Sequence, residues 1–216
     1  MVALCDVQIS RGGTLLFQHV NWQFAPASIT AVRKTGVLDG SSTLLMCCAG
    51  LVKPDKGVVK FNDADIQTLS EKERYTKLNY CYESGGLISL FTVYNNIATP
   101  LIYHDICTDN EAFARITQTA EELEIGDLLE YEPHQLNDVQ VRLVNLMRAL
   151  VLDAQVILID ELQTGMSEKM FAGVVEVLKR CADRGHTVVM VTTSGDHDEF
   201  ADHHLVIANK NLELRY

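Results

Sequence analysis

The sequence predicts an α/β fold in which a largely parallel core sheet is accompanied by antiparallel strands. Continuous apolar runs at residues 156–159 and 187–191 are typical of parallel strands that are covered on both faces. Segments with the apolar spacing of helices alternate with such runs along the chain. Two strand-like segments near the N-terminus, residues 2–9 and 15–24, predict a side lobe of antiparallel strands.

The remaining elements follow from turn signals and from periodicity. The turn Arg11-Gly12-Gly13 separates the first two strands. The next expected elements are a strand at 28–32, a loop at 33–41, a helix through Leu51, a turn at 53–57 and strands at 58–61 and 78–82. The C-terminal half is expected to contain helices at 110–130, 138–152 and 171–183 and a hairpin of residues 205–208 and 212–214. The first of these helices places apolar residues at helical spacing, namely Phe113, Ile116, Ala120 and Leu123.

Composition bounds the function. The 216 residues are enough for one domain, which can hold two lobes. A formal net charge of −11 disfavours nucleic-acid binding, which depends on Lys and Arg at phosphates, and charge-driven docking on anionic lipid. We see no signal peptide and no membrane-spanning stretch. The six cysteines show no metal-ligand spacing and indicate buried free thiols in a reducing, cytoplasmic compartment: Cys5, Cys47, Cys48, Cys81, Cys107 and Cys181.

One strand–loop–helix unit, residues 29–50, carries a resemblance to a known family. With the residues that follow it reads ITAVRKTGVLDGSSTLLMCCAGLVKPDKGVVKFNDADI, and it resembles the first nucleotide-binding segment of ABC-transporter ATPases. Further segments resemble the Q-loop (79–101), the signature motif (134–152), Walker B (156–161), the D-loop (163–167) and the H-loop (188–194) of that family. The phrasing around residues 83–101 looks similar to ATPases of MCE-type (Mla-like) phospholipid transport systems.

The resemblance implies a P-loop NTPase (RecA-like) core with an antiparallel β side lobe and a helical subdomain, of the ABC ATPase type. It implies one nucleotide-binding domain over residues 1–216. Its RecA-like and β lobe would comprise about residues 1–85 and 153–216, and its helical lobe about residues 86–152.

The expected phosphate loop, residues 35–42, departs from the family pattern G-x-x-x-x-G-K-[ST]. The lysine position holds Ser41 and the first glycine position holds Thr35. Asp39 adds a charge of the same sign as the ligand, and each non-glycine residue in a left-handed conformation costs roughly 1–2 kcal/mol. Arg11 falls where most members stack an aromatic ring on adenine. The candidate nucleotide contacts are Arg11, Lys34, Thr35, Gly36, Gly40, Ser41, Ser42 and Thr43.

Two interpretations of this loop stay open. Lys34, displaced by one extra residue, would reach the phosphates from a new direction. Alternatively, the loop is an ordinary strand-to-helix turn in which Ser41 or Ser42 caps the helix.

Other motif positions are also substituted. Glu83 stands at the Q-loop glutamine and Thr193 at the H-loop histidine. The signature position, where the family contacts the γ-phosphate on the opposite subunit, holds Asn137, Asp138, Val139 and Gln140. Glu161 remains at the position of the catalytic carboxylate, and the candidate Mg²⁺ ligands are Ser42, Glu83 and Asp160.

The resemblance implies an ATP-binding subunit that docks on a transmembrane permease at the cytoplasmic membrane, pairs with a second nucleotide-binding subunit and takes part in lipid transport. The substitutions predict that ATP hydrolysis is weak or lost and make binding of Mg-ATP doubtful. One alternative is a pseudo-ATPase scaffold that binds no nucleotide. Another is a working ATPase that uses Lys34, Glu83, Asp160 and Glu161.

The remaining polar features are expected to be structural. His203-His204 has no third ligand nearby in sequence, so His186, His197, His203 and His204 are interpreted as surface or hairpin residues. The acidic stretch 196–199 is interpreted as the start of a solvated helix.

Overall fold

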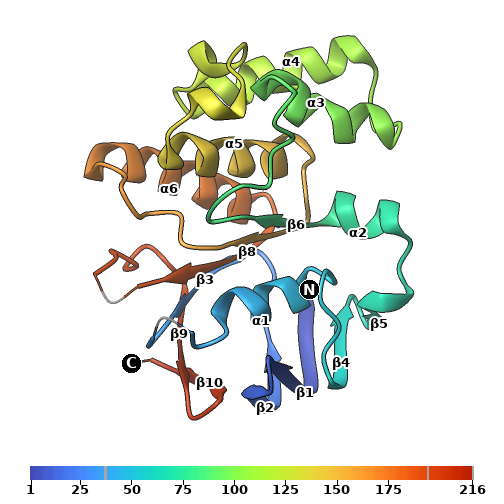
Figure 1. Ribbon diagram of the computed structural model, residues 1–216, viewed down its shortest axis with the longest axis vertical. Helices are drawn as coiled ribbons and strands as arrows, with labels where there is room; N and C mark the ends of the chain where they lie inside the picture. Colours follow the sequence, from blue (N-terminus) through green and yellow to red (C-terminus); the bar gives the residue numbers. More distant parts are fainter. Residues whose placement is uncertain (37, 194, 216) are drawn as a thin grey trace.

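Two β-sheets organise the chain in a computed structural model that describes residues 1–36, 38–193 and 195–215 (Figure 1). Residue 37 of the expected phosphate loop and residue 194 of the expected H-loop lie outside the described residues. The larger sheet has the strand order β10-β9-β3-β8-β7-β6. Its strands are β3 (Ser28–Arg33), β6 (Leu78–Cys81), β7 (Val156–Ile159), β8 (Thr187–Thr192), β9 (His203–Ala208) and β10 (Asn211–Leu214).

The larger sheet is parallel except at β10, which pairs antiparallel with β9. Every residue of β7 and β8 is buried. Alternate side chains enter two cores, since Ile157 packs with the helices that follow β6, whereas Leu158 packs with the N-terminal strands and the first helix. The expectation of parallel strands covered on both faces is confirmed.

The smaller sheet is antiparallel and has the order β2-β1-β4-β5. It comprises β1 (Val2–Arg11), β2 (Thr14–Gln23), β4 (Lys56–Phe61) and β5 (Ala64–Asp65). Figure 1 shows this sheet at the opposite end of the molecule from α3 and α4. The expected antiparallel side strands are therefore present.

Helices cover the larger sheet and extend beyond it. They are α1 (Ser41–Cys48), α2 (Glu71–Lys77), α3 (Val93–Tyr103), α4 (Asp109–Glu122), α5 (Asp138–Val151) and α6 (Glu168–Asp183), with 3-10 turns at Ile66–Thr68, Gly126–Leu128 and Pro133–Gln135. Within the described residues, none is long and apolar enough to cross a membrane.

Several expected helix boundaries were wrong. The helix expected at 110–130 ends at Glu122, because Glu124 has a left-handed backbone (φ 56°). Phe113 is 59% exposed, while Ala112 takes the buried position. The first helix ends at Cys48 rather than continuing to Leu51. The sequence-based expectations contain no helix at the positions of α2 and α3.

The cysteines are free thiols, as expected. Four of them are buried, and Cys5 and Cys107 are partly buried. Burial raises the pKa of Cys47 and of Cys81 to about 12. These two thiols are therefore protonated and unreactive at neutral pH.

Candidate functional site

The loop between β3 and α1 closes on one of its own carboxylates. Asp39 accepts hydrogen bonds from the backbone N–H of Thr35 (2.9 Å) and of Ser41 (3.1 Å). The Thr35 hydroxyl donates to the carbonyl of Ile207 (2.9 Å), which ties the start of the loop to β9. Two backbone N–H groups of the expected phosphate cradle, those of Thr35 and Ser41, are thus bound to a carboxylate of the chain itself.

The helix α1 begins without a side-chain cap. Its N-cap residue is Gly40, which has φ 89°, and a Cβ there would lie 2.8 Å from the ring of Phe17. Only glycine fits this position, because it combines a left-handed backbone with close packing. The interpretation in which Ser41 or Ser42 caps the helix was wrong.

The ammonium of Lys34 forms an ion pair with the carboxylate of Glu161. The two side chains are only 23% and 11% exposed, so solvent screens the pair weakly. Burial alone would lower the pKa of Lys34, but the hydrogen bond and charge of Glu161, with the charges of Glu83 and Asp39, raise it above its usual value. Lys34 is therefore a permanent cation beside three carboxylates.

Asp160 directly follows strand β7 and lies next to this pair. Its Oδ2 accepts a hydrogen bond from the Tyr80 hydroxyl (2.7 Å), whereas its Oδ1 is buried and has no hydrogen-bond partner among the described residues. Burial raises the pKa of the Asp160 carboxyl, against the opposing effects of the Ser42 and Tyr80 hydroxyls. The following residue, Glu161, has a left-handed backbone (φ 46°) that aims its side chain at Lys34.

The residues proposed as magnesium ligands do not form a ready metal centre. In the described part of the chain, no three His, Cys, Asp or Glu side chains are placed to hold a metal ion together. The orphaned Oδ1 of Asp160 would suit a cation. Glu161, however, already has the ammonium of Lys34 as its counter-ion. Lys34 thereby already places one positive charge beside the candidate ligands Glu83 and Asp160, where a Mg²⁺ ion would have to bind.

Three polar residues of α5, missed in the sequence, hold the loop that contains Glu83. Arg142 donates through Nε to the carbonyl of Glu83 (3.0 Å) and through Nη1 to the carbonyl of Thr164 (2.5 Å). Asn145 and Arg148 donate to the carbonyls of Gly85 (3.0 Å) and Gly86 (2.8 Å). The three-residue spacing of these polar residues within a mostly apolar helix was the signal that could have revealed them.

We expect Asn145→Ala to lower the free energy of unfolding by about 1–3 kcal/mol. The Asn145 side chain is fully buried, and its removal leaves the Gly85 carbonyl without its donor. Urea titration of both proteins measures the difference. Asn95→Ala, at an exposed asparagine of α3, is the matched control, and an equal effect of the two changes would contradict the assignment.

The signature position forms the start of α5. The Asn137 side chain accepts from the N–H of Gln140, and the Gln140 side chain accepts from the N–H of Asn137, both at 2.9 Å. This capping box satisfies two N–H groups at the helix terminus. Asp138 is exposed in the first turn, and Val139 packs against Gly165. The side chains of Asn137 and Gln140 thus have a structural role within this chain.

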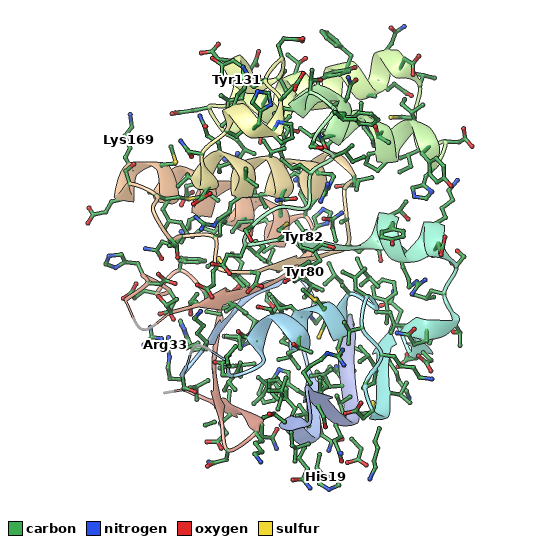
Figure 2. All side chains as sticks on the ribbon, in the orientation of Figure 1. His19, Arg33, Tyr80, Tyr82, Tyr131 and Lys169 are labelled. Carbon is green, nitrogen blue, oxygen red and sulfur yellow. The ribbon has the colours of Figure 1, made fainter. Side chains whose placement is uncertain are left out.

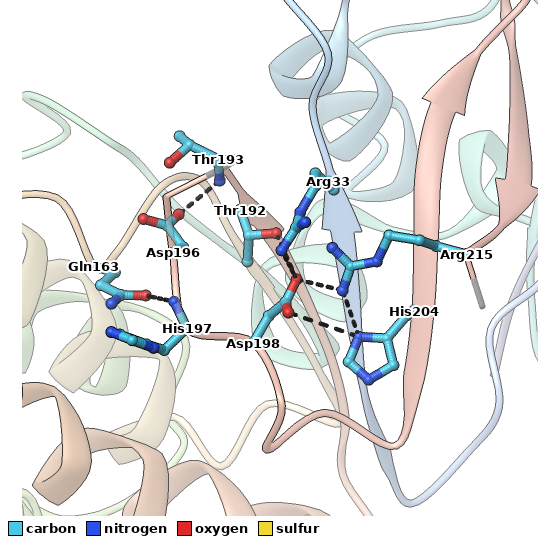
Figure 3. Close-up of polar contacts among 9 residues, drawn as sticks. All are labelled: Arg33, Gln163, Thr192, Thr193, Asp196, His197, Asp198, His204 and Arg215. Carbon is cyan, nitrogen blue, oxygen red and sulfur yellow. Dashed lines mark hydrogen bonds and ion pairs between the residues drawn. The ribbon is translucent and has the colours of Figure 1, made fainter.

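The H-loop position lies beside a cluster of charges centred on Asp198 (Figure 3). The N–H of Thr193 donates to Asp196 (2.6 Å). Asp198, only 3% exposed, accepts from Arg33 (3.0 Å) and Arg215 (2.7 Å), and His204 lies 4.0 Å from it. The interpretation of residues 196–199 as a solvated helix start was therefore wrong.

The candidate nucleotide-binding residues are only partly brought together. Lys34, Asp39, Glu83 and Glu161 lie within electrostatic reach of one another. Arg11 is exposed at the end of β1, where its guanidinium donates to the neighbouring Ser10 carbonyl (3.2 Å). The others lie along the loop and the start of α1, with Thr35 and Gly36 exposed, Ser42 and Thr43 half-buried and Ser41 buried.

A groove of about 700 Å³ lies between α2, α3 and β6. Leu51, Tyr75 and Tyr103 line it and are 41%, 49% and 78% exposed. Arg74 and Arg148 also line it. Exposed aromatic and apolar side chains gathered around a concavity are typical of a surface that binds a partner.

Comparison with known proteins places these features in a family. A family model described as ABC transporter matches residues 17–164. The chain is similar to the intermembrane phospholipid transport system ATP-binding protein MlaF of Haemophilus influenzae, with 24% identity over 98% of this chain and 82% of that protein. MlaF of Escherichia coli K12 is 26% identical over 98% of this chain and 80% of its own length.

A solved structure described as the dimeric structure of MJ0796, a bacterial ABC transporter cassette, has the same fold. Its TM-score is 0.87, with 24% identity over 99% of this chain and 97% of that one.

Proposed function

Because this chain belongs to the ABC transporter family, as an ATP-binding subunit, we propose that it docks on a transmembrane permease at the cytoplasmic membrane and has weak or no ATP hydrolysis. The proposal includes pairing with a second nucleotide-binding subunit of the same or another kind. It also includes the division into a RecA-like and β lobe (about residues 1–85 and 153–216) and a helical lobe (about residues 86–152).

The observation that carries the loss of hydrolysis is the closure of the phosphate loop on Asp39. Phosphoryl transfer depends almost entirely on positioning the phosphates and stabilising their charge. Here two loop N–H groups bind a carboxylate, the lysine position holds Ser41, and Glu161 is paired with Lys34. Two N–H groups of the phosphate loop, and the carboxylate at the position that would orient water, are therefore already bound within the chain.

Lipid transport is supported by the relatives. Two of them are named as ATP-binding proteins of intermembrane phospholipid transport systems, and each aligns with 98% of this chain. We propose that this chain serves a system of the same kind. The groove lined by Leu51, Tyr75 and Tyr103 is the proposed docking surface for the permease.

A pseudo-ATPase scaffold that binds no nucleotide is the second candidate function. The pairing of Lys34 with Glu161 favours it, because the site's carboxylate has a counter-ion in the absence of any ligand. The same pairing counts against a working ATPase that uses Lys34 for phosphate, since that mechanism needs Lys34 and Glu161 to act separately.

We expect the purified chain to show no Mg-ATPase activity above background. Thermal unfolding with and without millimolar Mg-ATP separates the two candidates, because a ligand that binds only the folded state must raise the melting temperature, and an unchanged melting temperature would favour the scaffold. Phosphate release and thermal unfolding measure the two quantities. A turnover that disappears in Glu161→Gln would overturn the proposal, and a thermal shift without turnover would favour the nucleotide-binding form over the scaffold.

A further inference from the structure

Among the described residues of the site, carboxylates outnumber cations, and one lysine lies among these carboxylates. Asp39, Glu83, Asp160 and Glu161 bring four carboxylates into this region, and Lys34 is the ammonium that bonds to Glu161 and interacts electrostatically with the others. Asp160 and Glu161 are only 3% and 9% exposed. Buried like charges repel strongly unless a cation lies near them.

We propose that Lys34 is a built-in substitute for a divalent cation, whose ammonium binds Glu161 and offsets the charges of the nearby Glu83 and Asp160 in the folded chain. This rests on the proposed function, in which the site no longer processes Mg-ATP. The ammonium of Lys34 is part of the chain, so this site contains a cation without a bound metal. The same loop also contains an anion in the place expected for phosphate. The Asp39 carboxylate accepts hydrogen bonds from two N–H groups of the expected phosphate cradle.

The orphaned oxygen of Asp160 is an independent indication of a cation requirement. Oδ1 is buried and lacks a hydrogen-bond donor among the described residues, although Oδ2 has the Tyr80 hydroxyl. A carboxylate oxygen of this kind could accept a divalent cation or one of its bound waters. Lys34 provides a single charge that Glu161 receives through a hydrogen bond, so the charge of Asp160 is offset by the Ser42 and Tyr80 hydroxyls and, at a distance, by Lys34. Removing Lys34 should therefore leave a carboxylate cluster with affinity for a divalent cation.

The test compares Lys34→Ala with the parent chain by thermal unfolding, without nucleotide, with 10 mM MgCl₂ or with NaCl of equal ionic strength. We expect Lys34→Ala to lower the melting temperature by about 5–10 °C in the absence of a divalent cation. A magnesium dissociation constant of about 1 mM would then restore about 3–6 °C in 10 mM MgCl₂. The parent chain should not respond to Mg²⁺.

Control variants separate a site effect from general screening and from misfolding. Lys77→Ala removes a half-buried lysine that pairs with Glu73 far from the site, and it should show no magnesium response. Lys34→Gln keeps a donor for Glu161 without the charge, so it should fold if Lys34→Ala does not, and should gain the same response. Lys34→Arg keeps the charge and should behave as the parent.

Three results would overturn the inference: a parent chain that gains as much from Mg²⁺ as the variants do, neutral Lys34 variants as stable as the parent, or destabilised variants that Mg²⁺ does not rescue beyond NaCl. None of these would bear on the proposed function, which depends on ATP turnover and on the response to Mg-ATP.

Discussion

Asp198→Ala is expected to lower the free energy of unfolding by about 3–5 kcal/mol. The carboxylate joins four segments, because it accepts from Arg33 at the end of β3, from Arg215 after β10 and from the Thr192 hydroxyl (3.4 Å) in β8, with His204 of β9 nearby. Its loss leaves the two guanidiniums, which are 28% and 23% exposed, without their counter-ion. Breaking a buried pair costs more than forming it gains, because the remaining charge is not rehydrated.

Urea unfolding of the two proteins measures this loss. The matched control is Glu199→Ala, which removes the neighbouring carboxylate from an exposed position. We expect the control to change the free energy of unfolding by less than about 0.5 kcal/mol. Comparable losses in both variants would show that the region responds to net charge rather than to the Asp198 contacts.

The difference in free energy of unfolding between the parent chain and Asp198→Ala should depend on pH in a direction set by the pKa of Asp198. Burial would raise the pKa of Asp198, but the hydrogen bond and charge of Arg215, with the charges of Arg33 and His204, lower it below its usual value. A carboxyl with a depressed folded-state pKa contributes stability above its unfolded pKa of about 3.9 and loses it as the pH falls through the folded pKa. The gap between parent and Asp198→Ala should therefore be full near pH 7 and shrink below about pH 4.

The sequence predicted the core sheet better than the helices around it. The runs at 156–159 and 187–191 are buried on both faces, so hydrophobicity alone marked them as strands. The short helix α2 buries none of its residues and thus has no apolar stripe to detect. The helix α3 contains Pro100, a residue that argues against a helix in a sequence. Capping by Ser70 and Thr92 was the remaining signal for these two helices.

At the site, the sequence identified the unusual residues but not their partners. Asp39 was expected to repel a ligand, and the structure adds that it binds N–H groups of its own loop. Lys34 and Glu161 are 127 positions apart, so only the parallel pairing of the sheet brings them together. The same holds for Asp198 and Arg33, which are 165 positions apart. Long-range ion pairs of this kind leave no local pattern in a sequence.

The second large effect is expected at the groove proposed to hold the permease. The double change Leu51→Ala and Tyr103→Ala should weaken assembly with the membrane partner by about 30-fold or more, since a central aromatic contact contributes about 2 kcal/mol or more. Tyr103 is 78% exposed and Leu51 41% exposed, so neither substitution opens a cavity in the core. The effect on folding should accordingly be small.

Tyr131→Ala is the matched control for that experiment. Tyr131 is 42% exposed and does not line the groove, and Figure 2 shows it in the uppermost part of the molecule, far above Tyr80 and Tyr82, which line the groove. The complex would be purified from source membranes through a tag on this chain, and the retained membrane subunit quantified for each variant. Leu51, Tyr103 and Tyr131 are all exposed and apolar or aromatic. If the effect came only from a general loss of surface hydrophobicity, Tyr131→Ala would reduce the retained membrane subunit as well. Only selective loss in the double variant supports docking at the groove, and full retention in that variant would place the permease elsewhere.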